Sequence, residues 1–172
     1  METLCLAFPF EYQILLVGDG EAKPQLVRLA RDLSLNECVV WADPVKHSDV
    51  PDYLNAIDVL VLPSYTSSHW KEQFGRILVE AMACGVPVVG STSGEIPNVI
   101  GDAGMTFRER DIDDLRQKLS ELAVNPERRF ELGKKGRARV QSHFSVPNVA
   151  RQYYVLFDRL VDHQGISNSS LI

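Results

Sequence analysis

The chain has 172 residues, of which 45% are hydrophobic and 24% charged, and its formal net charge at pH 7 is −5. This length and composition predict one soluble globular domain with a substantial core. The negative charge argues against nucleic acid as a partner, because nucleic-acid binding needs a basic face. Cys5, Cys38 and Cys84 are far apart and form no CxxC pair, which favours reduced thiols and a cytoplasmic location.

Short apolar runs rich in β-branched residues alternate with segments of helical periodicity. Strands are predicted at 13–18, 37–42, 58–63 and 86–91, with a weaker fifth at 104–108. Near-continuous apolar runs of this kind are typical of strands covered on both faces. The segments between them, at 23–35, 50–57 and 74–84, carry apolar residues at three- and four-residue spacing. This alternation predicts an α/β fold, a Rossmann-like parallel sheet sandwiched by helices.

The remainder of the chain is predicted to be helical, at 111–124, 126–144 and 146–161. Asp111 is the expected N-cap of the first of these helices, and Pro126 suits the first turn of the second. We expect a single domain over residues 1–162 and a disordered tail over 163–172, because the tail is polar and contains glycine.

The opening segment METLCLAF is predicted to be a helix, although parallel sheets of this type usually begin with a strand that delivers a ligand loop. We therefore expect the sheet to lack its first strand, which would lie upstream of Met1.

Ligands in open α/β sheets bind beyond the carboxyl ends of the strands, so the loops that follow the strands are the candidate sites. GDGEAK at 18–23 half resembles a dinucleotide fingerprint, but Lys23 replaces its third glycine, and Asp19 and Glu21 would repel a phosphate. A tight turn into a helix is the preferred interpretation. The loop at 64–75 is the longest of these loops, and long loops at strand ends tend to carry function.

A helix predicted from Arg76 begins directly after this long loop. The first main-chain N–H groups, near Gly75, Arg76 and Ile77, would point at an incoming anion with the helix dipole behind them, and Arg76 adds a positive charge. This arrangement predicts a diphosphate site.

Two glutamates flank that site. Glu80, one turn into the helix, is placed to accept hydrogen bonds from the paired hydroxyls of a ribose, and Glu72 to do so from the hydroxyls of a sugar. The alternative interpretation makes Glu72 a solvated loop charge and Glu80 an ion-pair partner of Arg76, four residues earlier. Because Glu80 interrupts the apolar run ILVEAMA, we favour the binding role.

The segment EQFGRILVE, followed by EAMACGVPVVGSTSGEIPNVIGDAG, resembles the E-x7-E region of retaining glycosyltransferases of family 4. The resemblance extends from about Leu4 to Leu160 and includes LLVGDG and DVLVLPS. It implies the C-terminal, donor-binding half of a GT-B enzyme, in which two Rossmann-like domains face a cleft.

By this resemblance Glu72 contacts the transferred sugar and is the catalytic candidate. The main chain of Phe74, Gly75, Arg76 and Ile77 would hold the sugar and the diphosphate, and Glu80 the ribose. The region from Trp41 to Val45 would lie near the nucleobase, although WADPV departs from the usual aliphatic-glycine pattern. In the family, a Gly-Arg pair and a Lys-Gly pair precede the helix that METLCLAF resembles, and their cations bind the diphosphate. By this resemblance, both cations are absent here.

The implied function is transfer of a sugar from an NDP-sugar to an acceptor hydroxyl, in polysaccharide or glycolipid synthesis, without a metal cofactor. The glycan or lipid-linked acceptor would bind a missing N-terminal domain, so the fragment alone is expected to be inactive. A sugar-nucleotide epimerase of GT-B architecture and a non-catalytic binding module remain open alternatives. The basic segment ERRFELGKKGRARV is expected to be a solvated helix face, with a peripheral contact to the inner membrane face as its alternative.

Overall fold

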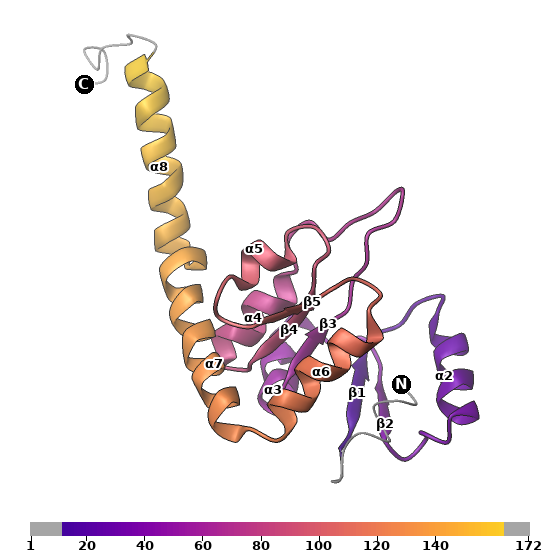
Figure 1. Cartoon of the computed structure of the whole chain (residues 1–172). Helices are drawn as coiled ribbons and strands as arrows, with labels where there is room; N and C mark the ends of the chain where they lie inside the picture. Colours follow the sequence, from indigo (N-terminus) through magenta and orange to yellow (C-terminus); the bar gives the residue numbers. More distant parts are fainter. Residues whose placement is uncertain (1–11, 164–172) are drawn as a thin grey trace.

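Two parallel β-sheets form the framework of the protein in the computed structural model, which describes residues 12–163 (Figure 1). In the first sheet β1 (Ile14–Val17) pairs with β2 (Val39–Ala42), with Ile14 opposite Val39. The second sheet has the order β3-β4-β5, built from Leu60–Leu62, Val88–Ser91 and Met105–Phe107. All the pairings are parallel, so the predicted strands and their direction are confirmed, each strand being shorter than the apolar run that predicted it.

The five described strands form a pair, β1-β2, and a separate triplet, β3-β4-β5, and no described strand joins the two sheets. Residues 1–11, which include the predicted opening helix, lie outside the described residues, as does the predicted tail from residue 164 onward.

Helices connect the strands and cover the second sheet. They are α2 (Lys23–Asp32), the 3₁₀ turn η1 (His47–Asp49), α3 (Val50–Asn55), α4 (Arg76–Cys84), α5 (Ile96–Ile100), α6 (Ile112–Ala123), α7 (Pro126–Arg139), the π-helical segment η2 (Val140–Phe144) and α8 (Val146–His163). Asp111 caps α6 by accepting the N–H of Asp114 at 2.9 Å, and Pro126 is the first residue of α7, as predicted. The short helix α5 was not predicted.

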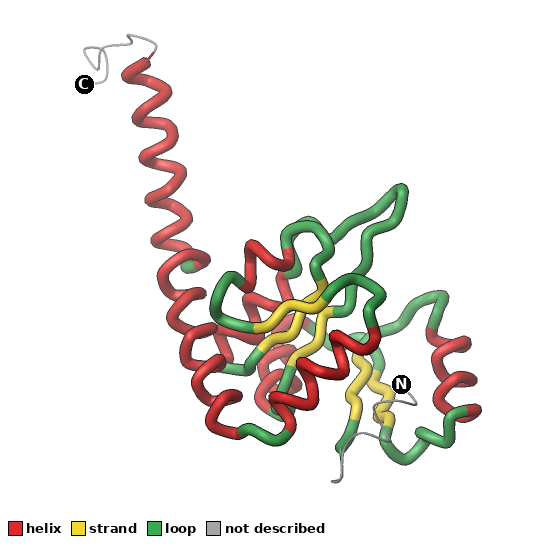
Figure 2. The backbone as a smooth tube through the Cα atoms, in the orientation of Figure 1, coloured by secondary structure: helices red, strands yellow, loops and turns green. Residues whose placement is uncertain are grey.

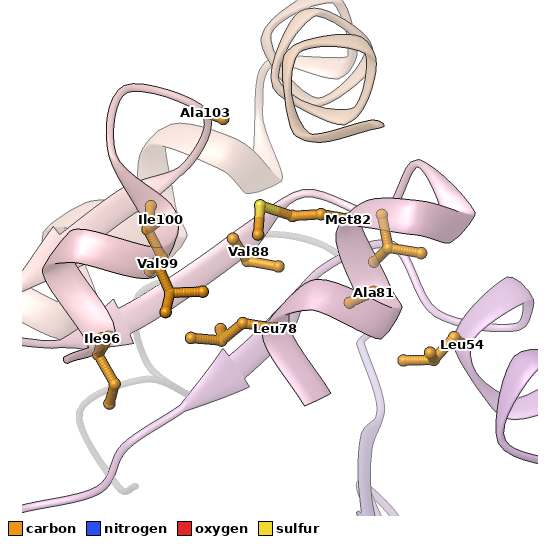
Figure 3. Close-up of a cluster of buried hydrophobic side chains, with 10 residues drawn as sticks. Leu54, Leu78, Ala81, Met82, Val88, Ile96, Val99, Ile100 and Ala103 are labelled. Carbon is orange, nitrogen blue, oxygen red and sulfur yellow. The ribbon is translucent and has the colours of Figure 1, made fainter. Parts of the chain in front are cut away.

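Strand β4 is the centre of the second sheet and is buried on both faces. Val88 belongs to a core formed with α4 and α5 through Leu78, Ala81, Met82 and Ile100 (Figure 3). The next residue, Val89, belongs to a separate core with Phe107, Leu122 and Leu132. This two-sided burial explains why the sequence of β4 is apolar without alternation.

The last helix, α8, extends away from the rest of the structure (Figure 1). Its side chains Tyr153, Leu156, Phe157 and Leu160 are each at least 50% exposed. Across residues 12–163, no helix combines the length and the apolar character needed to cross a membrane.

Candidate functional site

The loops that follow β3, β4 and β5 meet at the carboxyl edge of the second sheet, where α4 begins. Residues 63–75, between β3 and α4, project from the structure as an extended loop (Figure 2). Thr66 of this loop donates its N–H to Glu109, which follows β5, at 2.6 Å. Glu109 in turn donates its own N–H to the hydroxyl of Thr92, after β4, at 3.2 Å. These contacts draw the three loops together around the start of α4.

The side chain of Glu72 forms a hydrogen bond with the main chain at the start of α4. Its Oε1 accepts the main-chain N–H of Gly75 at 3.0 Å, and its Oε2 accepts the hydroxyl of Ser64 at 3.2 Å. The N–H of Gly75, which the sequence assigned to an incoming anion, therefore already has a carboxylate as its partner in the protein. A carboxylate is well placed here because the helix N-terminus favours negative charge. Glu72 thus orders the loop as well as standing beside the predicted donor site.

Gly75 adopts a left-handed conformation, with φ of +78°, at the point where the loop turns into α4. A Cβ at this position would lie 3.0 Å from Leu78 Cδ1 and 3.1 Å from Leu62 Cδ2. Both the conformation and the space therefore favour glycine.

The main chain of Glu72 is held from the other side by the loop between β4 and α5. Glu95 donates its N–H to the carbonyl oxygen of Glu72 at 3.0 Å. Gly94, with φ of +54°, approaches so closely that a Cβ there would lie 1.8 Å from the same oxygen. The GEIP segment, part of the sequence resemblance, therefore contacts the main chain of Glu72 and holds it in place.

Glu80 lies one turn inside α4, with its side chain 21% exposed. Its Oε1 is 3.1 Å from Nε of Arg76 and 3.7 Å from Nδ1 of His47. The ion pair with Arg76, considered above as the alternative interpretation, is therefore present, and the ribose role of Glu80 stays a prediction. His47 belongs to η1, after β2, so this contact also brings the loop predicted for the nucleobase next to α4.

The two residues predicted near the nucleobase occupy different settings. Trp41 lies within β2 and packs against the small core of Ala30, Leu35 and Val39. Val45 is half-buried in the following loop. Of this pair, only Val45 belongs to the loop at the carboxyl end of the strand.

The remaining predicted residues lie around the start of α4. Phe74 is 42% exposed and makes an edge contact with Phe144, with the ring centroids 5.7 Å apart. The Arg76 side chain is exposed, whereas Ile77 packs against the main core. The structure therefore groups Glu72, Phe74, Gly75, Arg76, Ile77 and Glu80 at one helix terminus.

A network of hydroxyl groups beneath the loop was missed by the sequence interpretation. Ser91 and Ser93 are fully buried, and the Ser91 hydroxyl donates to the carbonyl of Ser64. The hydroxyls of Ser93 and Thr66 are 3.1 Å apart, and Thr66 also donates its hydroxyl to Glu109 at 2.9 Å. The partners are separated by 27 and 43 positions, a spacing that carries no local signal.

Other candidate sites have structural roles. In GDGEAK, Lys23 donates its N–H to the carbonyl of Gly20 at 3.0 Å and its ammonium group to Asp43 at 3.2 Å, as expected for a turn into a helix.

Within the described part of the chain, no three His, Cys, Asp or Glu side chains gather where they could hold a metal ion.

Residues 9–139 match the family described as Glycosyl transferases group 1, and the chain belongs to this family. It is 37% identical over 136 residues to the GDP-mannose-dependent monoacylated alpha-(1-6)-phosphatidylinositol monomannoside mannosyltransferase of Corynebacterium glutamicum. It is 31% identical over 147 residues to the N-acetyl-alpha-D-glucosaminyl L-malate synthase of Bacillus anthracis. These alignments cover 77% and 84% of this chain but 35% and 37% of the relatives, so the chain spans little more than a third of their length.

Solved structures show the same fold. The sucrose-phosphate synthase of Thermosynechococcus elongatus superposes with a TM-score of 0.78 at 28% identity, covering 94% of this chain and 42% of that protein. HepE of Anabaena, solved in complex with UDP-glucose, superposes with a TM-score of 0.76 at 22% identity over 92% of this chain and 44% of HepE. The chain therefore has the Rossmann-like fold of one part of a GT-B enzyme.

Proposed function

We propose that the chain is the nucleotide-sugar-binding part of a retaining glycosyltransferase, which moves a sugar from an NDP-sugar to an acceptor hydroxyl. The observation that carries this proposal is the start of α4, where Glu72 and Glu80 stand on either side of the first turn and Arg76 lies between them. Family membership and a relative named as GDP-mannose-dependent support it.

Transfer separates a sugar with oxocarbenium character from a negatively charged nucleoside diphosphate. The main-chain N–H groups at the start of α4 and the guanidinium of Arg76 would stabilise that leaving charge. Arg76 can turn from Glu80 to the diphosphate at little cost, because its side chain is 75% exposed and exposed ion pairs contribute only about 0–1 kcal/mol. Glu80 would then accept the ribose hydroxyls.

The acceptor would be a glycan or a lipid-linked sugar, bound with a further domain, in polysaccharide or glycolipid synthesis at the cytoplasmic face of a membrane. No metal cofactor is proposed, in line with the family resemblance. Because the chain spans little more than a third of the length of its relatives, we expect it to bind a donor weakly and to transfer nothing on its own.

The test is NMR spectroscopy of the chain with UDP, GDP, ADP and CMP in parallel, with Glu80→Ala as the control. We expect a base-selective change in the amide signals of Arg76 to Glu80 that is lost in Glu80→Ala. If a nucleotide binds the variant and the wild type equally, the assigned donor site is wrong. Product analysis with the longer protein separates a transferase from an epimerase, and nucleotide binding without turnover would identify a non-catalytic binding module.

A further inference from the structure

We propose that Trp70, at the tip of the 63–75 loop, is a stacking surface for a pyranose ring next to the donor site. The proposal rests on the proposed function for the identity of the ligand, and adds to it a sugar contact outside the E-x7-E segment.

The loop that carries Trp70 has a fixed conformation. Ser67 donates its N–H to the carbonyl of Trp70 at 2.8 Å, and the Ser67 hydroxyl accepts the N–H of Trp70 at 3.1 Å. At the base of the loop, Glu109 accepts the N–H and the hydroxyl of Thr66, and the guanidinium of Arg110 lies 4.6 Å from the ring centroid of Tyr65. The main chain of Trp70 is therefore held by hydrogen bonds within the loop, and the base of the loop is held by its contacts with Glu109 and Arg110.

This ordered loop nevertheless leaves its largest apolar side chain in contact with solvent, since Trp70 is 52% exposed. Exposing an indole forgoes the burial free energy that a large aromatic side chain ordinarily gains. The indole borders an open hollow of about 300 Å³ lined by residues 66–71 and Gln73. Apart from Trp70, this lining consists of hydroxyl, imidazole, amide and ammonium side chains.

The composition of the lining favours a sugar over other ligands. A single apolar ring among polar groups is too little for a hydrophobic peptide or an acyl chain, which need a continuous apolar surface. Lys71 is the one permanent cation of this lining, and a single exposed ammonium group contributes little to the binding of an anion. A pyranose ring has C–H faces that stack on an aromatic ring and hydroxyls that hydrogen-bond to polar neighbours, the combination that small-ligand sites provide.

Trp70 stands two residues before Glu72, so its Cα lies within about 7 Å of the Cα of the residue proposed to contact the transferred sugar. The ring could belong to the donor sugar or to the acceptor, and the experiment separates these sources.

The experiment follows the indole N–H signals of the ¹⁵N-labelled chain, which come from Trp41 and Trp70. The ligands are methyl α-D-glucopyranoside, methyl α-D-mannopyranoside and sorbitol, a polyol that has no ring face. We expect the glycosides to move the Trp70 signal and to leave the Trp41 signal and the sorbitol spectrum unchanged. Absence of any glycoside shift, or an equal shift with sorbitol, would overturn the proposal.

Variants test the ring itself, with the amide signals of residues 67–71 as the readout. Trp70→Ala should weaken glycoside binding about tenfold or more, whereas Trp70→Phe should retain most of it. Tyr154→Ala is the matched control, because it removes an exposed aromatic side chain from α8. Equal affinity in Trp70→Ala and the wild type would also overturn the proposal.

Further titrations identify the source of the ring. A Trp70 shift with UDP-glucose beyond that with UDP assigns the ring to the donor, and a glycoside shift that persists beside bound UDP-glucose assigns it to the acceptor. If nucleotides leave Arg76 to Glu80 unchanged while glycosides move Trp70, the proposed donor site fails and the ring site stands. The reverse result removes the ring site and leaves the donor site.

Discussion

The carboxylate of Glu72 accepts the main-chain N–H of Gly75, three residues later, at 3.0 Å. This relationship places the first glutamate of the E-x7-E segment at a helix N-terminus, where a negative charge is stabilised. A donor that uses the Gly75 N–H must displace or share this contact. Under the proposed function, we therefore expect Glu72 to change partners when a sugar diphosphate binds, which would link the conformation of the loop to donor binding.

We expect Glu72→Ala to lower the free energy of unfolding by about 1 kcal/mol, because loss of a side-chain acceptor at a helix start typically costs that much. Glu72→Gln should be closer to the wild type, since its amide oxygen can still accept the Gly75 N–H. Urea unfolding of the two variants provides the measurement. Equal stability of Glu72→Ala and the wild type would show that the hydrogen bond does not stabilise the loop.

Glu80→Ala should weaken nucleotide binding by about 10–100-fold, from the loss of one or two charge-assisted hydrogen bonds to the ribose. Its stability should change little, because the partner side chain of Arg76 is exposed. Arg76→Ala is the informative comparison. It should weaken binding of the nucleoside diphosphate and spare the nucleoside, whereas Glu80→Ala should weaken both in calorimetric titration. A Glu80→Ala variant that binds the nucleoside normally would remove Glu80 from the ribose role.

Gly94→Ala should destabilise the protein by about 2 kcal/mol, the cost of a strained left-handed residue, with a further contribution from displacing the Glu72 carbonyl. Gly20→Ala is the matched control, since a Cβ there would meet nothing within 4 Å. Thermal unfolding of both variants checks the difference. Similar melting temperatures would mean that the loop after β4 can move away from Glu72 freely.

The ionisation of Asp114 should make the free energy of unfolding depend on pH in the acidic range. The main-chain N–H of Arg108, which donates to Asp114 at 2.9 Å, lowers the pKa of this carboxyl below its usual 3.8, and the Arg108 guanidinium and Lys118 add to the effect. Because the pKa is lower in the folded state, the ionised carboxylate stabilises the protein at pH values above the pKa of the unfolded state. This contribution is lost as the pH falls through the pKa of the folded state.

Asp114→Asn should therefore be less stable than the wild type at pH 6, and the difference should shrink at pH 3. The measurement is chemical unfolding at both pH values. Asp113→Asn serves as the control, because its ion pair with Arg116 is on the surface and should contribute little. A difference for Asp114→Asn that is the same at both pH values would contradict the assignment.

The features that depend on a local sequence pattern were predicted correctly. The uninterrupted apolar run of β4, the cap at Asp111 and the proline at position 126 each have a local physical cause, and each is confirmed. The helix starting at Arg76 is confirmed for the same reason, because glycine conformation and apolar spacing coincide there.

The contacts that fix the site depend on residues distant in the chain. Glu109 reaches Thr66 across 43 positions, and Gly94 supports Glu72 through main-chain geometry. Neither relationship produces a periodicity or a spacing that a single sequence reveals. The identity of the Gly75 N–H acceptor was likewise unpredictable, because a protein carboxylate and a ligand phosphate suit the same helix terminus.

The separation of the two sheets has a consequence for folding cooperativity. The unit of β1, α2 and β2 has its own core, whose buried members are Ala30, Leu35 and Val39, and within residues 12–163 no sheet hydrogen bonds join it to β3-β4-β5. Amide protons of β1 and β2 should therefore exchange with solvent through a local opening of low free energy, while those of β4 exchange only with global unfolding. Native-state hydrogen exchange that showed one common free energy for Leu16 and Val89 would mean that the two units unfold together.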